Sequence, residues 1–196
     1  MNAVKIIIAL VASIAVGGAY AWVTQNWSDI IPIYPLIVAG CLYLLMIWVS
    51  KKKSTAILFG VLLSIAAIGA NLFTGMELMK NDIKTELVSA GLISSTDPGV
   101  KDAVNEIMDE YLLEATGYKG IVGYTVSLSI GEFTTKSGNT IVDDEPSAAG
   151  TVFQAVKFGI LLLGPVIMGW RRKEEKQEEA PAAPSEDNGA AVTDKA

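Results

Sequence analysis

The stretch TAILFGVLLSIAAIGANLFT, residues 55–74, decides the fold class of this chain. It contains no charged side chain, and a helix of this length rises about 30 Å, which matches the hydrocarbon core of a bilayer. Three further blocks of similar length and apolar character lie at residues 4–23, 30–49 and 152–170. The sequence therefore predicts an α-helical integral membrane protein with four transmembrane helices.

The composition of the 196-residue chain supports this class and excludes several kinds of chemistry. Hydrophobic residues make up 51% of the chain and charged residues 18%, below the roughly 25% typical of soluble domains. The sequence has no His, which excludes a Ser-His-Asp triad and any His-ligated metal or haem. Its single Cys excludes an internal disulfide and a multi-Cys metal site. We expect no cofactor, no metal site, no catalytic residues and no nucleic-acid partner.

The positions of the basic residues predict the orientation in the membrane. Basic side chains flank the apolar blocks at Lys5, at 51–53 and at 171–173, whereas the short connection 24–29 has none. With four spans these three basic sites fall on one side, and the positive-inside rule makes that side cytoplasmic. We expect both termini in the cytoplasm and segment 75–151, with 5 Lys and 13 Asp or Glu, outside it.

The start of the chain has a second interpretation. Residues 1–21 combine Lys5, an apolar run and the small-x-small pattern of Ala19 and Ala21, which is typical of a signal-peptidase site. Apolar character continues to Val23, so a span of full length is also present. Cleavage of a signal peptide would leave three spans in the same orientation.

Segment 75–151 begins with two predicted amphipathic helices. Apolar residues recur at helical spacing over 76–88, and Gly91 is placed to end that helix. Asp97, followed by a proline, is predicted to cap a second helix. Its apolar stripe covers 100–112 and stops at Gly117.

The remainder of this segment has the pattern of short strands. Residues 122–131 alternate strictly between apolar and small or polar side chains, which predicts a half-buried strand. The turn residues 137–139 lie between 133–135 and 140–142, so an antiparallel hairpin is expected. Together the helices and strands predict a small α+β extracytoplasmic domain inserted between the third and fourth transmembrane helices.

Residues 171–196 form a charged, proline-containing segment with little apolar surface, which predicts a disordered cytoplasmic tail.

The order of two short connections, a large external segment and a cytoplasmic tail is similar to the layout of the tetraspanin family. The resemblance concerns topology alone: segment 75–151 has no Cys and lacks the disulfide motif of that family. No residue roles follow from it.

Three polar residues at the outer ends of the predicted spans are the candidate site residues. Lys157 lies inside the fourth span, where its stem can snorkel to the interface or its charge can attract an anion or carboxylate. Asn71 and Gln154 can bond across a helix interface, as structural contacts or as part of a substrate site. The external acidic residues show no calcium-loop pattern.

These features favour a non-enzymatic interaction, scaffold or accessory subunit of a membrane complex. The partners expected are the lipid bilayer and other membrane proteins or a second copy of the chain. The alternative is a small transporter or channel subunit that functions as an oligomer. A membrane enzyme ranks last because no nucleophile–base set is visible. The Cys-free external segment favours a bacterial cytoplasmic membrane as the location.

Overall fold

The computed structural model describes residues 3–26, 33–94, 98–130, 132–134, 140–142 and 148–171. Helices account for most of these residues. The elements in chain order are α1 (Ala3–Asn26), α2 (Ile33–Val49), α3 (Lys53–Ser89), α4 (Val100–Thr116), α5 (Gly120–Ser127), β1 (Glu132–Thr134), β2 (Thr140–Val142) and α6 (Ala148–Arg171). The helices α1, α3 and α6 are long and apolar enough to cross a membrane, and α2 is a shorter apolar helix of 17 residues.

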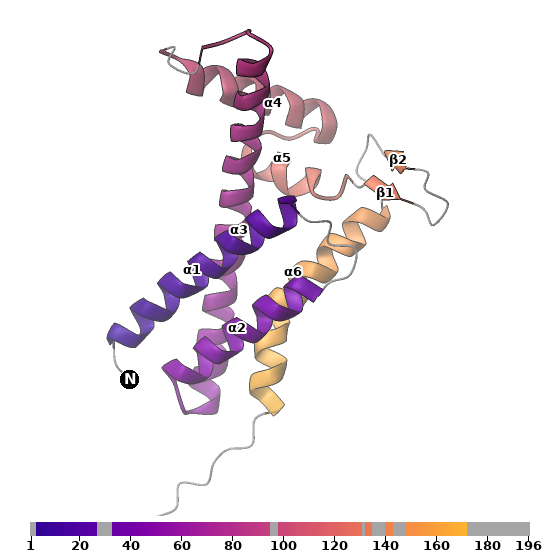
Figure 1. Cartoon of the computed structure of the whole chain (residues 1–196). Helices are drawn as coiled ribbons and strands as arrows, with labels where there is room; N and C mark the ends of the chain where they lie inside the picture. The colour runs from indigo at the N-terminus through magenta and orange to yellow at the C-terminus, as the bar shows by residue number, and fades with distance from the viewer. Residues whose placement is uncertain are drawn as a thin grey trace, which may run out of the picture.

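Four helices form one elongated bundle, with α4 and α5 at one end of it (Figure 1). The start of α1, the connection between α2 and α3, and the end of α6 all lie at the opposite end. Between the helices the bundle is filled by fully buried apolar side chains, among them Leu42, Met46, Leu63 and Leu161. We refer to α4 and α5 as the cap and to the end that carries them as the cap end.

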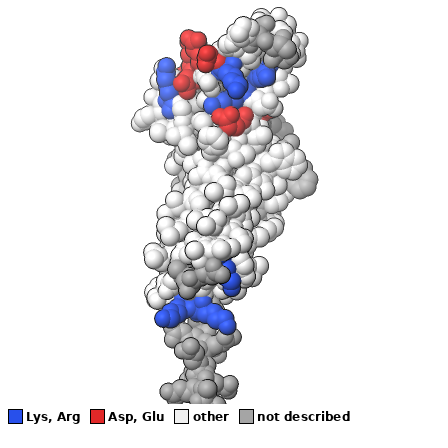
Figure 2. All heavy atoms as spheres, turned by 90° about the vertical axis from the view of Figure 1, so that its left-hand side faces the viewer, with Lys and Arg blue, Asp and Glu red and all other residues white. Residues whose placement is uncertain are grey.

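The outer surface of the bundle is apolar along its length. Large hydrophobic side chains are more than half exposed on α1, α3 and α6, for example Val11, Leu58 and Leu163. Figure 2 shows charged side chains gathered at the two ends of one face, with an uncharged surface between them. This distribution is compatible with a membrane protein, because lipid tails leave apolar side chains unpenalised and exclude charged ones.

Small residues allow the helices of the bundle to approach closely. A Cβ added at Gly17 in α1 would lie 2.1 Å from the backbone oxygen of Ala67 in α3. A Cβ added at Gly60 in α3 would lie 2.7 Å from the sulfur of Met46 in α2. Packing within the chain therefore explains why these glycines are needed.

The helix that contains 55–74 continues without interruption into the helix predicted over 76–88. Together they form the 37-residue α3, which rises about 55 Å and extends well beyond one bilayer thickness. The predicted end is confirmed: Ala90 is the C-cap, and Gly91 has a φ of +70° that favours glycine. The C-terminal part of α3 thus extends to the cap end, where it contacts α4 and α5.

The second predicted helix is confirmed as α4, but the prediction of its first residue is wrong. The helix begins at Val100 with Gly99 as its N-cap, and Pro98 lies in the preceding turn. The residue proposed as the cap, Asp97, lies outside the described residues. The apolar stripe predicted for this helix is confirmed in part: Val100, Val104, Met108 and Leu112 are buried, whereas Ile107 and Tyr111, which the pattern also assigned to it, are exposed.

The strand predicted over 122–131 is wrong, because most of that stretch forms helix α5. The alternating pattern predicts a strand, but α5 is a short helix in which Gly123 is the buried residue. A Cβ added at Gly123 would lie 2.2 Å from the Tyr118 backbone oxygen and 3.0 Å from the Leu112 Cβ. Close packing on α4 overrides the local strand pattern.

The α+β domain predicted for 75–151 is not confirmed. Beyond the helices, the described residues of this segment add only β1 and β2, three residues each, which pair antiparallel with Phe133 opposite Ile141. The turn residues 137–139, the acidic run 143–145 and the tail from residue 172 onward lie outside the described residues.

Candidate functional site

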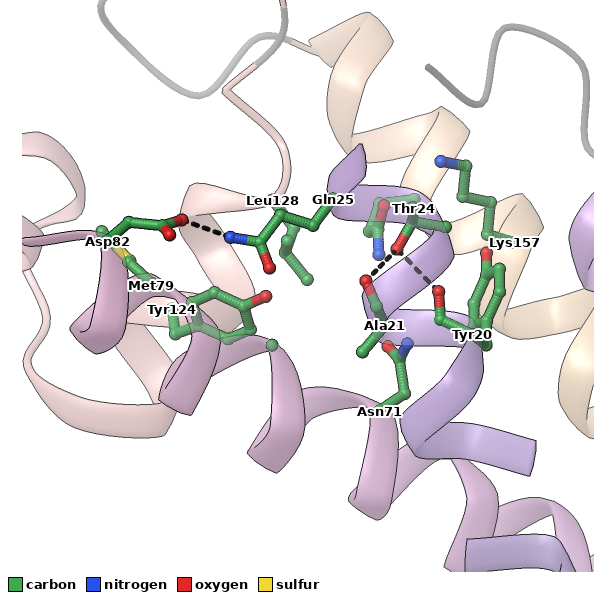
Figure 3. A pocket seen from close by; sticks show the side chains of 12 residues that line it. Tyr20, Ala21, Thr24, Gln25, Asn71, Met79, Asp82, Tyr124, Leu128 and Lys157 are labelled. Atoms are coloured by element: carbon green, nitrogen blue, oxygen red, sulfur yellow. Dashed lines mark hydrogen bonds between the residues drawn. The ribbon is translucent and has the colours of Figure 1, made fainter. Parts of the chain in front are cut away.

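A polar cavity of about 330 Å³ lies where the cap meets the bundle. Its walls come from the end of α1, the middle of α3, α5 and the start of α6 (Figure 3). The lining residues are Tyr20, Ala21, Thr24, Gln25, Asn71, Gly75, Met79, Asp82, Tyr124, Leu128, Gln154 and Lys157. Four elements that are distant in sequence thus contribute to one site.

All three candidate residues from the sequence line this cavity. Asn71 on α3 is buried, with 8% of its surface exposed, and its amide points from α3 toward α1 in Figure 3. Gln154 and Lys157 are half-buried on α6 and form part of the opposite wall. The sequence indicated each residue by its polarity within an apolar block, and the fold brings the three together.

The side chain of Lys157 rests on an aromatic ring of its own helix. Its Nζ lies 4.4 Å from the centroid of the Phe153 ring, one helical turn earlier in α6. A cation over a ring face gains about 0.5 to 2 kcal/mol, depending on how far it is desolvated. An ammonium group has three N–H donors and is a common partner of phosphate and carboxylate oxygens.

Sequence analysis missed the opposite end of the cavity. Gln25 at the end of α1 donates a hydrogen bond from Nε2 to Oδ2 of Asp82 on α3, across 57 positions of sequence. Asp82 is exposed, so its carboxylate remains hydrated on one side. Neither residue lies in a block of unusual composition, and no spacing rule pairs them. Their meeting follows from the packing of α1 on α3.

Tyr124 on α5 also lines the cavity (Figure 3). Burial raises the pKa of Tyr124 above its ordinary value, so the hydroxyl stays protonated at neutral pH and remains able to donate a hydrogen bond. A Cβ added at Gly75 would lie 2.1 Å from this hydroxyl oxygen. Glycine at position 75 therefore lets α5 dock against α3.

Below the cavity, the bundle is closed by apolar side chains. Leu42, Leu63 and Leu161 are at most 1% exposed and fill the interior between α2, α3 and α6. Within the described ranges, no group of three or more His, Cys, Asp or Glu could hold a metal ion.

A second feature lies on the outer surface of the cap. Ile107 and Tyr111, four residues apart on α4, share one face of the helix and are 39% and 50% exposed. Glu110 and Glu114 follow them at helical spacing and are also exposed. The whole of α4 has one Lys and five acidic residues, so this apolar pair lies in a negative field.

Comparison with protein-family models, with curated proteins and with solved structures gives no match to this chain. The class is therefore defined by the fold alone. The residues that the structure describes are mostly helical and include three long apolar helices, which are compatible with a membrane location.

Proposed function

We propose that this chain is a non-enzymatic accessory subunit of a membrane complex, whose cap binds another membrane protein. The observation that carries the proposal is the exposed apolar pair Ile107 and Tyr111, bordered by Glu110 and Glu114. An apolar centre with a charged rim is the usual composition of a protein interface, and Tyr is enriched among residues that dominate binding energy.

The proposal includes four spans, with α2 as the fourth, both termini in the cytoplasm and the cap outside it. Its support is the alignment of Lys5, Lys51 to Lys53 and Arg171 at one end of the bundle, opposite the acidic cap. The close packing of Gly17 on Ala67 supports retention of α1 as a span. A bacterial inner membrane is proposed because the cap segment has no Cys.

The charge on α4 favours a different protein over a second copy as the partner. In a symmetric pair through this face, Glu110 and Glu114 of each copy would meet like charges, which costs interaction energy. A partner with Lys or Arg around an apolar patch would gain steering and register from the same residues.

Site-specific photocrosslinking in native membranes tests this proposal. A benzoyl-phenylalanine at position 111 is expected to give a product with a second, different membrane protein. The same group at position 113 is the matched control, since Leu113 is 45% exposed but lies on another face of α4. Charge reversal by Glu110→Lys with Glu114→Lys is expected to reduce the product at position 111 by roughly fivefold or more, because a rim charge sets steering and register.

Monomer alone at position 111 would contradict the accessory role. Equal products at positions 111 and 113 would contradict the assignment of this face. A homodimer as the sole product would overturn the choice of a different protein as the partner.

A transporter or channel subunit is the second candidate, because the polar residues Asn71, Gln154 and Lys157 share one cavity. The apolar floor of that cavity means that conduction would require a rearrangement or a path between copies. Flux of small ions across proteoliposomes containing the protein tests this function. Vesicles as tight as protein-free controls would reject it.

A further inference from the structure

We propose that a groove between α3 and α4 binds a phosphate monoester group. The groove has a volume of about 360 Å³ and lies where α4 crosses the C-terminal part of α3 (Figure 1). Its lining residues are Glu77, Lys80, Asn81, Lys84, Val100, Lys101, Val104 and Asn105. The groove shares no lining residue with the polar cavity or with the partner surface on α4, so the inference is independent of both.

Two helical stripes place the polar side chains of the groove. On α3, Glu77, Lys80 and Lys84 recur at three- and four-residue spacing, which puts them on one face of the helix. On α4, Lys101 and Asn105 are four residues apart and share a face in the same way. The two faces meet at the groove, so ammonium groups from both helices line one space.

The groove concentrates positive charge in an acidic part of the chain. Segment 75–151 contains 5 Lys and 13 Asp or Glu, and three of those five Lys line this groove. Three Lys and one Glu among the described lining residues give a formal charge of +2. Ammonium groups that line one space repel one another, so an anion between them lowers the electrostatic energy.

Two of the three ammonium groups are left for a ligand. Lys80 forms an ion pair with Glu77, in which Nζ lies 2.8 Å from Oε1. Among the residues that the structure describes, neither Lys84 nor Lys101 forms an ion pair. Their two charges match the charge of about −1.5 to −2 that a phosphate monoester carries at neutral pH. A carboxylate or a phosphodiester carries one charge and would leave one ammonium without a counter-charge.

The groove also offers hydrogen-bond donors and an apolar contact surface. Each ammonium has three N–H donors, and the amides of Asn81 and Asn105 add neutral ones. Charge-assisted hydrogen bonds to phosphate oxygens are among the stronger protein contacts. Val100 and Val104 are 7% and 4% exposed and form the apolar part of the wall. This surface can contact the organic part of a small phosphate monoester.

The position of the groove along α3 favours a dissolved ligand. Lys80 and Lys84 are six and ten residues past Thr74, the end of the apolar block, which corresponds to about 9 and 15 Å along the helix. In the proposed membrane placement, lipid head groups extend roughly 5 to 8 Å beyond the hydrocarbon. The groove therefore faces water. Because phosphatidic acid carries the same monoester group on a lipid, the experiment includes both sources.

Isothermal titration calorimetry of the purified full-length protein in a non-ionic detergent tests the inference. At pH 7.5, methyl phosphate is expected to bind roughly tenfold or more tightly than dimethyl phosphate or acetate, which carry one charge each. Binding of methyl phosphate would assign a dissolved source. Binding of phosphatidic acid without binding of methyl phosphate would assign a lipid source, and either result supports a monoester site.

Four single variants locate the site. Lys84→Gln and Lys101→Gln are each expected to lower the affinity for the monoester roughly tenfold, because each removes a charge-assisted hydrogen bond. Lys119→Gln makes the same change on the cap outside the groove and is expected to bind as the unmodified protein does. Glu77→Gln releases Lys80 and is expected to raise the affinity about threefold or more, a gain that misfolding cannot produce.

Failure of both methyl phosphate and phosphatidic acid to bind would overturn the inference. Equal affinity for acetate and methyl phosphate would indicate a carboxylate ligand and would overturn it as well. The same holds if the two groove lysine variants, shown to be folded by circular dichroism, keep their affinity, if Lys119→Gln loses affinity equally, or if Glu77→Gln binds no more tightly. Photocrosslinking at position 111 reports on the partner surface separately, so failure of one proposal is distinguishable from failure of the other.

Discussion

Replacement of Gly17 by leucine is expected to lower the free energy of unfolding in detergent by at least about 3 kcal/mol, the upper part of the usual range for overpacking. The physical reason is the 2.1 Å separation between an added Cβ and the backbone oxygen of Ala67. Backbone atoms cannot rotate away, so α1 must separate from α3. Unfolding by SDS titration, followed by circular dichroism, measures the change.

Gly69→Leu on α3 is the matched control for this experiment. No atom lies within 4 Å of a Cβ added at Gly69, and that residue is exposed. The variant is expected to unfold within about 0.5 kcal/mol of the unmodified protein. Equal stability of Gly17→Leu and Gly69→Leu would show that α1 does not pack on α3 through Gly17.

Replacement of Gly75 by valine is expected to detach α5 from α3 and to destabilise the cap by about 2 kcal/mol. The added side chain would occupy the position of the Tyr124 hydroxyl, which is 2.1 Å from an added Cβ. Amide hydrogen exchange in α5 is expected to accelerate about 30-fold, since a tenfold change corresponds to about 1.4 kcal/mol. Exchange measured by mass spectrometry reports this locally.

A double-mutant cycle assigns this effect to the pair. Tyr124→Ala removes the side chain that a valine at position 75 would strike, so adding Gly75→Val to it is expected to cost less than about 0.5 kcal/mol. Gly69→Val controls for a β-branched residue in α3. Additive losses in the double variant would contradict the contact between Gly75 and Tyr124.

The sequence predicted four apolar helices, and a helix covers most of each block; α1, α3 and α6 are long and apolar enough to cross a membrane, whereas α2 is shorter, so four transmembrane helices are not confirmed. A helix was predictable for residues 55–74, because in hydrocarbon a single segment can satisfy its own backbone hydrogen bonds only as a helix. The buried residues Val100, Val104, Met108 and Leu112 were predictable from a different signal, the fixed helical spacing of apolar side chains. These signals are local and strong.

The failures arose where packing between segments decides the outcome. Residues 122–131 alternate like a strand, yet Gly123 fits so closely on α4 that a short helix forms. The N-cap of α4 is Gly99 rather than the predicted Asp97, because turn residues offer several N-cap choices.

The candidate site was predictable in part. Asn71, Gln154 and Lys157 stood out because polar groups in apolar blocks are costly. Gln25 and Asp82 did not, since both lie where polar residues are ordinary and their bond depends on how α1 crosses α3. A sequence indicates which residues are unusual, but the packing decides which of them meet.

The most direct test of the account is the membrane side of each end of the bundle. In a Cys41→Ala background, Leu92→Cys places a thiol at the cap end, where Leu92 is 71% exposed, and Lys52→Cys places one at the basic end. A membrane-impermeant maleimide is expected to label position 92 in intact cells with an accessible envelope, and position 52 only after lysis. Labelling of both positions in intact cells, or of position 52 alone, would contradict a membrane-spanning bundle with an external cap.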